Sequence, residues 1–561
     1  MNTDKHGHYP ETIKLVFVLS VFICVYPWLI PGKVDGRTPI FLGKSLDRWQ
    51  RGLNDRDAKV RRSAAFALGR MGEDAQTAVP LLATRLLKDD NAGVRDMSAS
   101  AIGDIVKALK GSPTLWDKAG GALVKALKED ENPHVRRSAA YALGAFGPQA
   151  SGTLEQLRKA LKDEAASVRQ NAAWALGQMG KDAGEAVGAL GECLNDKDTL
   201  VRRDAADALG SMGKAGSAGV QSLIELVKSE PDEVVKKTAL HSLSHLAGPE
   251  HKPYARGLES LLDSKDSEIA LGAAIVLARI GGEDTKPAVD VLRRALKNSD
   301  AQTQAMATAS LATLGPIAAP AMHDLADVLT NANNSPTLRG GAALAIAHIG
   351  TAAEPVVPAL AKAIRPSEPL EVRQYAAEAF GQMKYPATKE GLPAILEAIE
   401  KDTDPLVRQK CVWSLFPMKR EVMEETKADK VLEKVLDEPS GAMNLVRYDA
   451  ARKLAVYLGA DAPDKTATVL LHMLTNTTLK VYNSTDAKVE GSGNEAASGR
   501  VNVQANTGGD ARYMAAQALG AMGAKARKRP DVVEALKKAA KDGDAKLRET
   551  ATKALEAIGV D

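Results

Sequence analysis

The chain has 561 residues, 74 basic and 71 acidic side chains, a formal net charge of +3 and 4% aromatic residues. This length exceeds what a single compact core usually holds, and the balanced charge argues against a nucleic acid as the main partner. Three scattered cysteines, Cys24, Cys193 and Cys411, make neither a disulfide framework nor a metal site, and we expect the last two to be small buried apolar residues.

The N-terminal region carries an apolar run, IKLVFVLSVFICVYPWLI, whose one charged residue is Lys14. At ~1.5 Å per residue the run spans roughly 27 Å as a helix, enough to cross a hydrocarbon core. No small-residue cleavage site follows it, which favours an uncleaved anchor over a removed signal peptide. We therefore predict a tail at 1–12, a single-pass transmembrane helix at 13–31 and a linker at 32–44. Basic residues on both sides leave the topology open, and we expect the remainder to be extracytoplasmic, in a bacterial periplasm.

From residue 45 onward one phrase recurs, written VRRSAAYALGAFG at 135–147. The spacing is close to 34 residues, which is typical of a repeat protein. Twelve copies fall within 45–474 and two within 509–561. The residues at position 2 of the phrase, counted from its Val, are Arg61, Arg95, Arg136, Arg169, Arg202, Lys236, Ala270, Gln304, Arg339, Arg373, Arg408, Arg447, Arg512 and Arg548.

Each repeat is predicted to hold two helices, a short first helix with Leu at i and i+4 and a second helix made by the phrase. Positions 1, 5, 8, 9 and 12 form a stripe about 100° wide that must face neighbouring helices. In one copy they are Val135, Ala139, Ala142, Leu143 and Phe146. The position-2 Arg follows an acidic turn in most copies, so we expect it to contact the turn carboxylate or carbonyls in a structural role.

This pattern, D-x-x-VR-x-x-AA-x-ALG-x-MG, resembles HEAT-like repeats of the short, phycobilin-lyase-associated type. The resemblance covers roughly residues 45–561. It implies an all-α fold, a curved right-handed α-solenoid of about fourteen repeats with the second helices lining its concave side. It implies little about function, since most such proteins look like binding scaffolds. The tetratricopeptide repeat has the same period, but its Trp-Leu-Gly-Tyr pattern is missing.

An insertion at 475–508 interrupts the repeats. Its alternating Leu479 and Val481, then Val501 and Val503, flank Gly, Ser and Asn turns. This is a strand-and-turn signal that predicts a small hairpin, with an irregular loop as the alternative.

Catalytic chemistry has little support in the sequence. HEAT-like deoxyhypusine hydroxylases hold iron with His-Glu pairs, and this sequence has no His-Glu dipeptide. His241 and His245 lie at i and i+4 but lack the Glu of a zinc protease motif, and the GKS at 43–45 lacks the earlier Gly of a phosphate-binding loop. We therefore expect no catalytic, metal or cofactor site. A HEAT-like enzyme or enzyme-accessory subunit, lyase-like or a metal-dependent oxidoreductase, is the alternative.

Positions 3 and 7 of the phrase point away from the packed stripe and carry aromatic and basic side chains. Such residues are common interface anchors, so the concave face is predicted to bind an acidic or amphipathic protein or peptide. Tyr448 and Tyr513 hold position 3 in later repeats. The predicted binding residues are Phe66, Tyr141, Trp174, Arg62, Arg137, Arg203 and Trp413.

Overall fold

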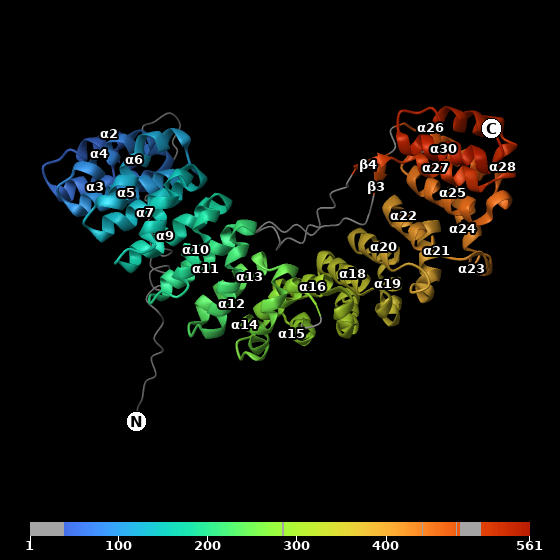
Figure 1. The fold of residues 1–561 in the computed structure, drawn as a ribbon, viewed down its shortest axis with the longest axis horizontal. Helices are drawn as coiled ribbons and strands as arrows, with labels where there is room; N and C mark the ends of the chain where they lie inside the picture. Colours follow the sequence, from blue (N-terminus) through green and yellow to red (C-terminus); the bar gives the residue numbers. More distant parts are fainter. Residues whose placement is uncertain (1–38, 283–284, 440, 478–479, 483–506, 561) are drawn as a thin grey trace, which may run out of the picture. The chain divides into compact units, whose positions relative to one another are not determined.

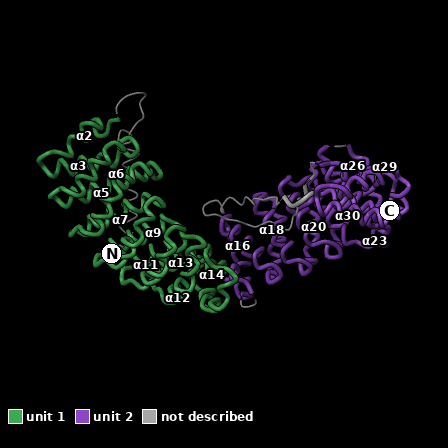
Figure 2. Tube along the Cα trace, turned by 45° about the horizontal axis from the view of Figure 1, so that its top comes forward, with its two compact units in different colours: residues 1–276 green, residues 277–561 purple. Residues whose placement is uncertain are grey.

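The computed structural model describes residues 39–282, 285–439, 441–477, 480–482 and 507–560 (Figure 1). The predicted tail at 1–12 and transmembrane helix at 13–31 lie outside these residues, as does most of the predicted linker. The chain divides into two compact units, 1–276 and 277–561, coloured separately in Figure 2.

In unit 1, first helices, most of them short, alternate with second helices, and consecutive second helices pack side by side. The first helices are α2 (Leu46–Gly52), α4 (Val79–Lys88), α6 (Pro113–Glu129), α8 (Leu154–Ala160), α10 (Val187–Cys193), α12 (Val220–Ser229) and the 3₁₀ segment η6 (Pro249–Asp263). The second helices are α3 (Ala58–Met71), α5 (Ala92–Ala108), α7 (Pro133–Phe146), α9 (Ala166–Met179), α11 (Thr199–Ser211), α13 (Glu233–Leu246) and α14 (Ser267–Ile280), in which the unit ends.

Local sequence sets where these helices begin and end. The second helix α11 begins after Asp198, whose carboxylate accepts hydrogen bonds from two backbone N–H groups of the first turn. At the other end, α7 stops at Gly147, where φ is 58°, a conformation that other residues adopt only at a cost. A 3₁₀ segment then leads into the next first helix. These segments are η2 (Gly72–Ala78), η3 (Gly147–Thr153), η4 (Gly180–Ala186) and η5 (Gly213–Gly219).

The predicted packed stripe is confirmed, because Val135, Ala139, Ala142, Leu143 and Phe146 are all buried. The buried surface is wider than the stripe, however. Ser138 and Ala140 are buried too. The reason is that α7 packs against a first helix and also against the second helices α5 and α9 on either side. Small residues at these positions allow the close approach.

Unit 2 follows the same alternation. Its first helices are α15 (Lys286–Leu296), α17 (Met322–Thr330), α19 (Val357–Ala363), α21 (Leu392–Lys401), α24 (Ala428–Val435), α26 (Asp464–Thr475) and α29 (Pro530–Ala539). Its second helices are α16 (Ala301–Leu314), α18 (Pro336–Ile349), α20 (Leu370–Met383), α22 (Pro405–Ser414), α25 (Asn444–Leu458), α27 (Arg512–Ala521) and α30 (Ala545–Ala557). The short connecting segments are η8 (Gly315–Ala321), η9 (Gly350–Val356), η10 (Lys389–Gly391), α23 (Arg420–Glu425), η11 (Gly459–Asp461) and α28 (Ala524–Arg527).

Two small strand pairs complete the described fold. β1 (Ile40–Phe41) and β2 (Lys44–Ser45) form a tight antiparallel pair that the sequence did not predict. In the region of the insertion, β3 (Lys480–Tyr482) pairs antiparallel with β4 (Thr507–Asp510). The second predicted strand at Val501 and Val503 lies outside the described residues. Within the described residues, one short strand pair lies where the insertion leaves and rejoins the repeats.

Among the described residues, the stretches Ala301–Thr330 and Pro336–Ala363 are long and apolar enough to cross a membrane by length and composition alone. Each stretch holds a second helix, a 3₁₀ segment and the following first helix. Within each stretch the chain turns after the second helix, at Gly315 in the first stretch and at Gly350 in the second, where φ is 56° and 76°. We therefore interpret both stretches as packed repeat helices.

Candidate partner-binding face

Most of the position-2 arginines link their repeat to the next. Arg136 donates to both carboxylate oxygens of Asp163, at 2.8 and 2.9 Å, and to the carbonyl oxygens of Asp130 and Glu131. The carbonyls belong to its own repeat, while the carboxylate belongs to the turn of the following repeat. The contact predicted from sequence is confirmed, and it also joins neighbouring repeats. The equivalent pairs are Arg61–Asp89, Arg95–Asp130, Arg169–Asp196, Arg202–Glu230, Arg339–Glu368, Arg373–Asp402 and Arg408–Glu438.

The electrostatics of these pairs fit a structural role. Burial works against the charged form of Asp163, but the hydrogen bonds from Arg136 and from the Ala165 N–H outweigh it, and the pKa of Asp163 lies below its usual value. The hydrogen bond to Asp163 in turn raises the pKa of Arg136. Both groups stay ionised near neutral pH, so neither is available for proton transfer.

Position 7 of the second helices forms a row across unit 1, which we call the position-7 row. Phe66 is 47% exposed, and the rings of Tyr141 and Trp174 are half-buried. Those two rings come from the consecutive helices α7 and α9 and stack with centroids 5.4 Å apart and an interplanar angle of 22°. The Tyr141 hydroxyl donates to Asp104 at 2.9 Å, and burial raises the pKa of Tyr141. The structure thus brings two of the three predicted aromatic residues together. The row consists of Phe66, Ser100, Tyr141, Trp174, Asp207, His241 and the buried Ile275.

The aromatic rings also pack against the preceding helix. A Cβ atom placed on Gly144 would lie 2.6 Å from the Trp174 ring, and one placed on Gly103 would lie 2.7 Å from the Tyr141 ring. Glycine at position 10 of one repeat therefore makes room for the aromatic residue at position 7 of the next. This contact fixes the rings and leaves part of each on the surface formed by positions 3, 7 and 11, which we call the second-helix face.

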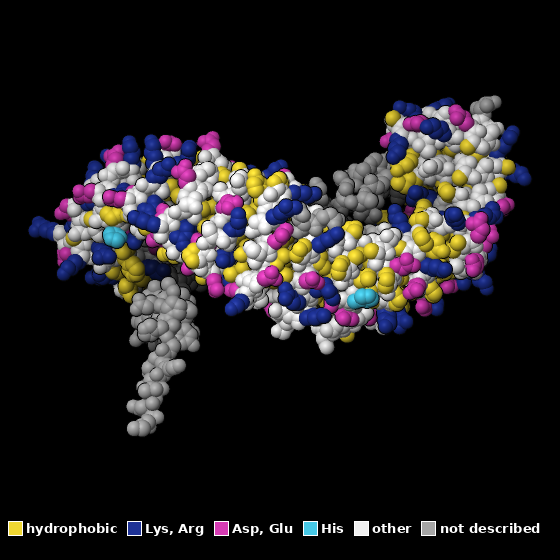
Figure 3. Space-filling view, turned by 60° about the horizontal axis from the view of Figure 1, so that its bottom comes forward, with side chains coloured by type: hydrophobic (Ala, Val, Ile, Leu, Met, Phe, Trp, Pro, Cys, Tyr) yellow, Lys and Arg dark blue, Asp and Glu magenta, His cyan; other side chains and the backbone are white. Residues whose placement is uncertain are grey.

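The basic residues on this face are not alike. Arg62 is exposed. Arg137 pairs with Asp96 of the preceding repeat at 3.2 Å, and Arg203 pairs with its neighbour Asp204 at 2.7 Å. On the face drawn in Figure 3, basic and acidic side chains are interspersed. The ion pairs of Arg137 and Arg203 with neighbouring carboxylates remove the physical basis for expecting an acidic partner.

Trp413 in unit 2 has a different environment from the aromatic residues of unit 1. Its indole N–H donates to Asp449 at 2.8 Å, and the Lys410 ammonium lies 4.3 Å from its ring centroid. Tyr448, predicted to be exposed at position 3, is only 1% exposed, and its hydroxyl is hydrogen-bonded to His472. That prediction was wrong because the position-3 side chain turns toward α26, which borders the insertion. Tyr448 is thus committed to internal contacts, whereas Trp413 is half-buried and stays a predicted binding residue.

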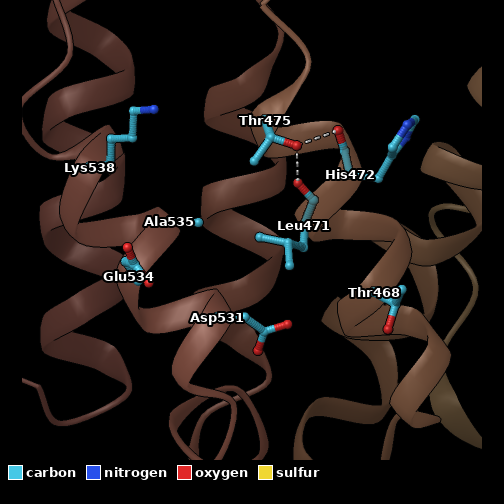
Figure 4. Close-up of a pocket in the computed structure, with 8 residues that line it drawn as sticks. All are labelled: Thr468, Leu471, His472, Thr475, Asp531, Glu534, Ala535 and Lys538. Carbon is cyan, nitrogen blue, oxygen red and sulfur yellow. Dashed lines mark hydrogen bonds between the residues drawn. The ribbon is translucent and has the colours of Figure 1, made fainter.

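Two further features bring polar side chains together. The exposed rings of His241 and His245 lie 4.8 Å apart, but no group of three or more His, Cys, Asp or Glu residues suited to a metal occurs among the described residues. A shallow groove of about 520 Å³ lies between α26 and α29 (Figure 4). Its Asp531 is held by Arg529 in a bidentate ion pair, and Thr475 donates to its own helix backbone. Neither feature assembles a nucleophile with a base.

The structure adds two residues that the sequence interpretation missed. Asp207 belongs to the position-7 row, so its place in the repeat could have identified it. Lys453 holds position 8, where most copies have Ala, and that departure from the pattern was the available signal. It is 4% exposed, and its ammonium donates to the carbonyls of Phe416 and Met418 at 2.8 Å each. Burial lowers the pKa of Lys453 to about 8.

Comparison with family models supports the repeat assignment. The HEAT-repeat model matches residues 46–118, 121–184, 154–244 and 357–455, and the PBS lyase HEAT-like repeat model matches residues 511–542. No curated protein matches the sequence significantly.

The cysteines Cys193 and Cys411 are buried and free, in agreement with their expected packing role.

Solved structures share the fold at low sequence identity. Kap95p, whose binding induces the switch loops of RanGDP to adopt the GTP-bound conformation, is 14% identical with a TM-score of 0.51, over 97% of this chain and 66% of that one. Importin beta, in an ammonium sulfate condition, is 14% identical with a TM-score of 0.47, over 91% of this chain and 74% of that one. At this identity the likeness concerns the fold alone.

Proposed function

Because the family matches cover more than half of its length, the chain belongs to the HEAT-repeat family, and we propose that it is a membrane-tethered scaffold that binds a partner protein on the second-helix face. The observation that carries this proposal is the stacked pair Tyr141 and Trp174. Two aromatic rings on neighbouring helices are partly exposed at a regular place in the repeat. Aromatic residues in such settings are the commonest anchors of protein interfaces.

The geometry of the pair favours binding. The stack, the hydroxyl bond to Asp104 and the packing on Gly103 and Gly144 hold the rings before a partner arrives. Less conformational entropy is then lost on association, which raises affinity for a given contact area. The exposed Phe66, two repeats earlier in the same row, would extend the surface.

The kind of partner follows from the fold and the surface. Kap95p uses this fold and binds another protein, RanGDP, which supports a protein ligand here. The acidic partners of Arg137 and Arg203 on this face argue against a polyanion such as a nucleic acid. The enzyme alternative is not favoured, since the described residues bring no nucleophile, base and acid together and hold no cluster suited to a metal.

The tether is the part of the proposal that rests on sequence alone. Residues 13–31 are apolar enough and long enough to span a bilayer. An anchored solenoid would hold its partner near the membrane, and a periplasmic position for the repeats belongs to the same proposal. Full-length protein that leaves membranes in a carbonate wash would contradict the tether without touching the binding face.

The test of binding compares the full-length protein with a Tyr141→Ala, Trp174→Ala double variant. Proteins captured by the wild type are identified, purified and titrated against both forms. We expect affinity to fall tenfold or more, since anchor residues typically contribute ~2 kcal/mol or more. Tyr254→Ala is the matched control, because Tyr254 is also half-buried but lies in η6, on the first-helix side of unit 1. Equal affinity of the double variant and the wild type would place the binding site elsewhere.

A further inference from the structure

The position-7 row changes character along unit 1. After Tyr141 and Trp174, the next two repeats place Asp207 and then His241 at the same position. The helices that carry them, α9, α11 and α13, pack consecutively (Figure 1). Trp174 stacks on Tyr141 on one side, so its other side faces the repeat that carries Asp207. An aromatic surface therefore continues into a carboxylate.

The carboxylate of Asp207 lacks a cation of its own. It is exposed, and none of the hydrogen bonds or ion pairs found among the described residues involves it. The nearby Arg203 is already paired with Asp204, which also accepts a hydrogen bond from Gln170 at 2.9 Å. Partial burial raises the pKa of Asp207, the negative charge of Asp204 raises it further, and His241 and Arg203 oppose the shift. The site thus holds two carboxylates for one internal arginine.

A cation suits this place for two physical reasons. A positive charge beside Asp207 relieves the repulsion between the two carboxylates. The same charge over the face of a tryptophan ring gains a cation–π interaction, which is strongest with indole.

We propose that Trp174, Asp204 and Asp207 form a surface site that binds a lysine or arginine side chain from an extended segment of the partner protein. This inference rests on the proposed function, whose partner it describes more closely. An extended segment advances ~3.3 Å per residue, whereas packed helices lie ~8–10 Å apart. A basic side chain at Asp207 and an apolar one on the Tyr141–Trp174 stack then lie about four residues apart in the segment. The partner motif is basic and apolar, the reverse in charge of the one expected from sequence.

The probe is a phage-displayed library of random peptides of about twelve residues, long enough to span about four repeats. The full-length protein is the bait, and selected peptides are synthesised and titrated. We expect enrichment of Lys or Arg about four positions from an aromatic or aliphatic residue, at the spacing argued above. Asp207→Asn should weaken these peptides about fivefold and Asp207→Lys more than tenfold. Raising the salt concentration should weaken them as well.

The controls separate the two proposals. Asp117→Asn removes an exposed carboxylate from the first helix α6 of the same unit and should leave affinity unchanged. Two outcomes would overturn the proposed cation site while leaving the binding face supported. In the first, selected peptides need Tyr141 and Trp174 but carry no basic residue. In the second, the selected peptides bind the Asp207→Lys variant as well as the wild type. Peptides indifferent to the Tyr141→Ala, Trp174→Ala double variant, or no selected peptide at all, overturn the binding face itself.

Discussion

The first repeat of unit 2 is joined to its neighbour differently from the repeats of unit 1, although the position-2 ion pairs return later in unit 2 at Arg339, Arg373 and Arg408. In the first five repeats of unit 1, every position-2 residue is an arginine bonded to the carboxylate of the next turn. In the first second helix of unit 2, α16, that position is Gln304, which donates to the Leu296 carbonyl at 2.9 Å. There the ion pairs move to the first helices, where Arg293 and Lys297 both contact Asp324, at 2.6 and 2.9 Å.

The two arrangements differ in exposure. The side chain of Arg136 is 11% exposed, whereas that of Arg293 is 39% exposed. An enclosed, bidentate pair is costly to break because removal of one partner leaves a charge without solvent or counter-ion. A more exposed pair contributes little. The comparison teaches that the repeat fold requires contact between neighbours, while the strength of each link depends on where its charges lie.

The apolar core should not distinguish the two units. Leu143 and Leu311 both hold position 9 and are fully buried. Truncation to Ala should cost about 2–5 kcal/mol at either site. Because repeats interact mainly with their neighbours, amide hydrogen exchange should speed up only in adjacent repeats. Loss of protection over the whole chain would contradict this local coupling.

The ionic links should distinguish α7 of unit 1 from α16 of unit 2. Arg136→Ala leaves Asp163 without its partner and should cost about 3 kcal/mol. Gln304→Ala removes one neutral hydrogen bond and should cost about 1 kcal/mol. Hydrogen exchange of α7 and α9 measures the first effect, and that of α16 the second. An Arg136→Ala, Asp163→Asn double variant should recover part of the loss, since no charge then remains enclosed.

Acid should weaken unit 1 through the same links. The pKa values of Asp163 and Asp196 lie below normal because the arginine and backbone hydrogen bonds outweigh burial. Their stabilising effect is complete above the ordinary carboxylate pKa of about 4 and is lost as pH falls through the lower folded-state pKa. We expect α7 and α9 to lose exchange protection before α16 as pH is lowered through this range. Simultaneous loss of protection in all three helices would argue against the position-2 ion pairs as the cause.

Alkali should act on unit 2 through Lys453. Its pKa in the folded chain is about 8, because burial disfavours the ammonium, while the unfolded chain keeps the ordinary value of about 10.4. The unfolded state therefore binds more protons between these values, and unfolding free energy should rise by at most about 1.4 kcal/mol per pH unit. A neutral amine still has two N–H donors for the carbonyls of Phe416 and Met418. Urea unfolding at about pH 8 and about pH 9.5 measures the rise, which Lys453→Met should abolish.

The smallest effects should come from the second-helix face. Arg62→Ala removes an exposed side chain and should change stability by less than about 0.5 kcal/mol. Arg137→Ala breaks a partly exposed pair with Asp96 and should also cost under about 0.5 kcal/mol. Thermal unfolding of both variants checks this. A large loss of stability for the Arg137 variant alone would show that the pair with Asp96 resembles the enclosed position-2 ion pairs rather than a surface contact.

Much of the fold could be predicted because the residues that pack between helices recur at fixed positions of one short phrase. Leu143 and its equivalents are buried wherever they occur, since a helix of this pattern has one apolar side. The candidate site was harder to predict. Tyr141 and Trp174 were found from their shared position, but Tyr448 was misplaced, because a side chain on the edge of the stripe can turn inward when a neighbouring helix receives it.

The sequence by itself determined the two-helix repeat, its period, its packed positions and the contact of Arg136 with an acidic turn, because these depend on local periodicity and on spacing that recurs in every copy. Only the tertiary structure decided that the carboxylate is Asp163 of the next repeat, that Arg137 and Arg203 are paired, and that Asp207 is not. Charge pairing across helices depends on distances between residues far apart in the chain, and a one-dimensional pattern does not contain them.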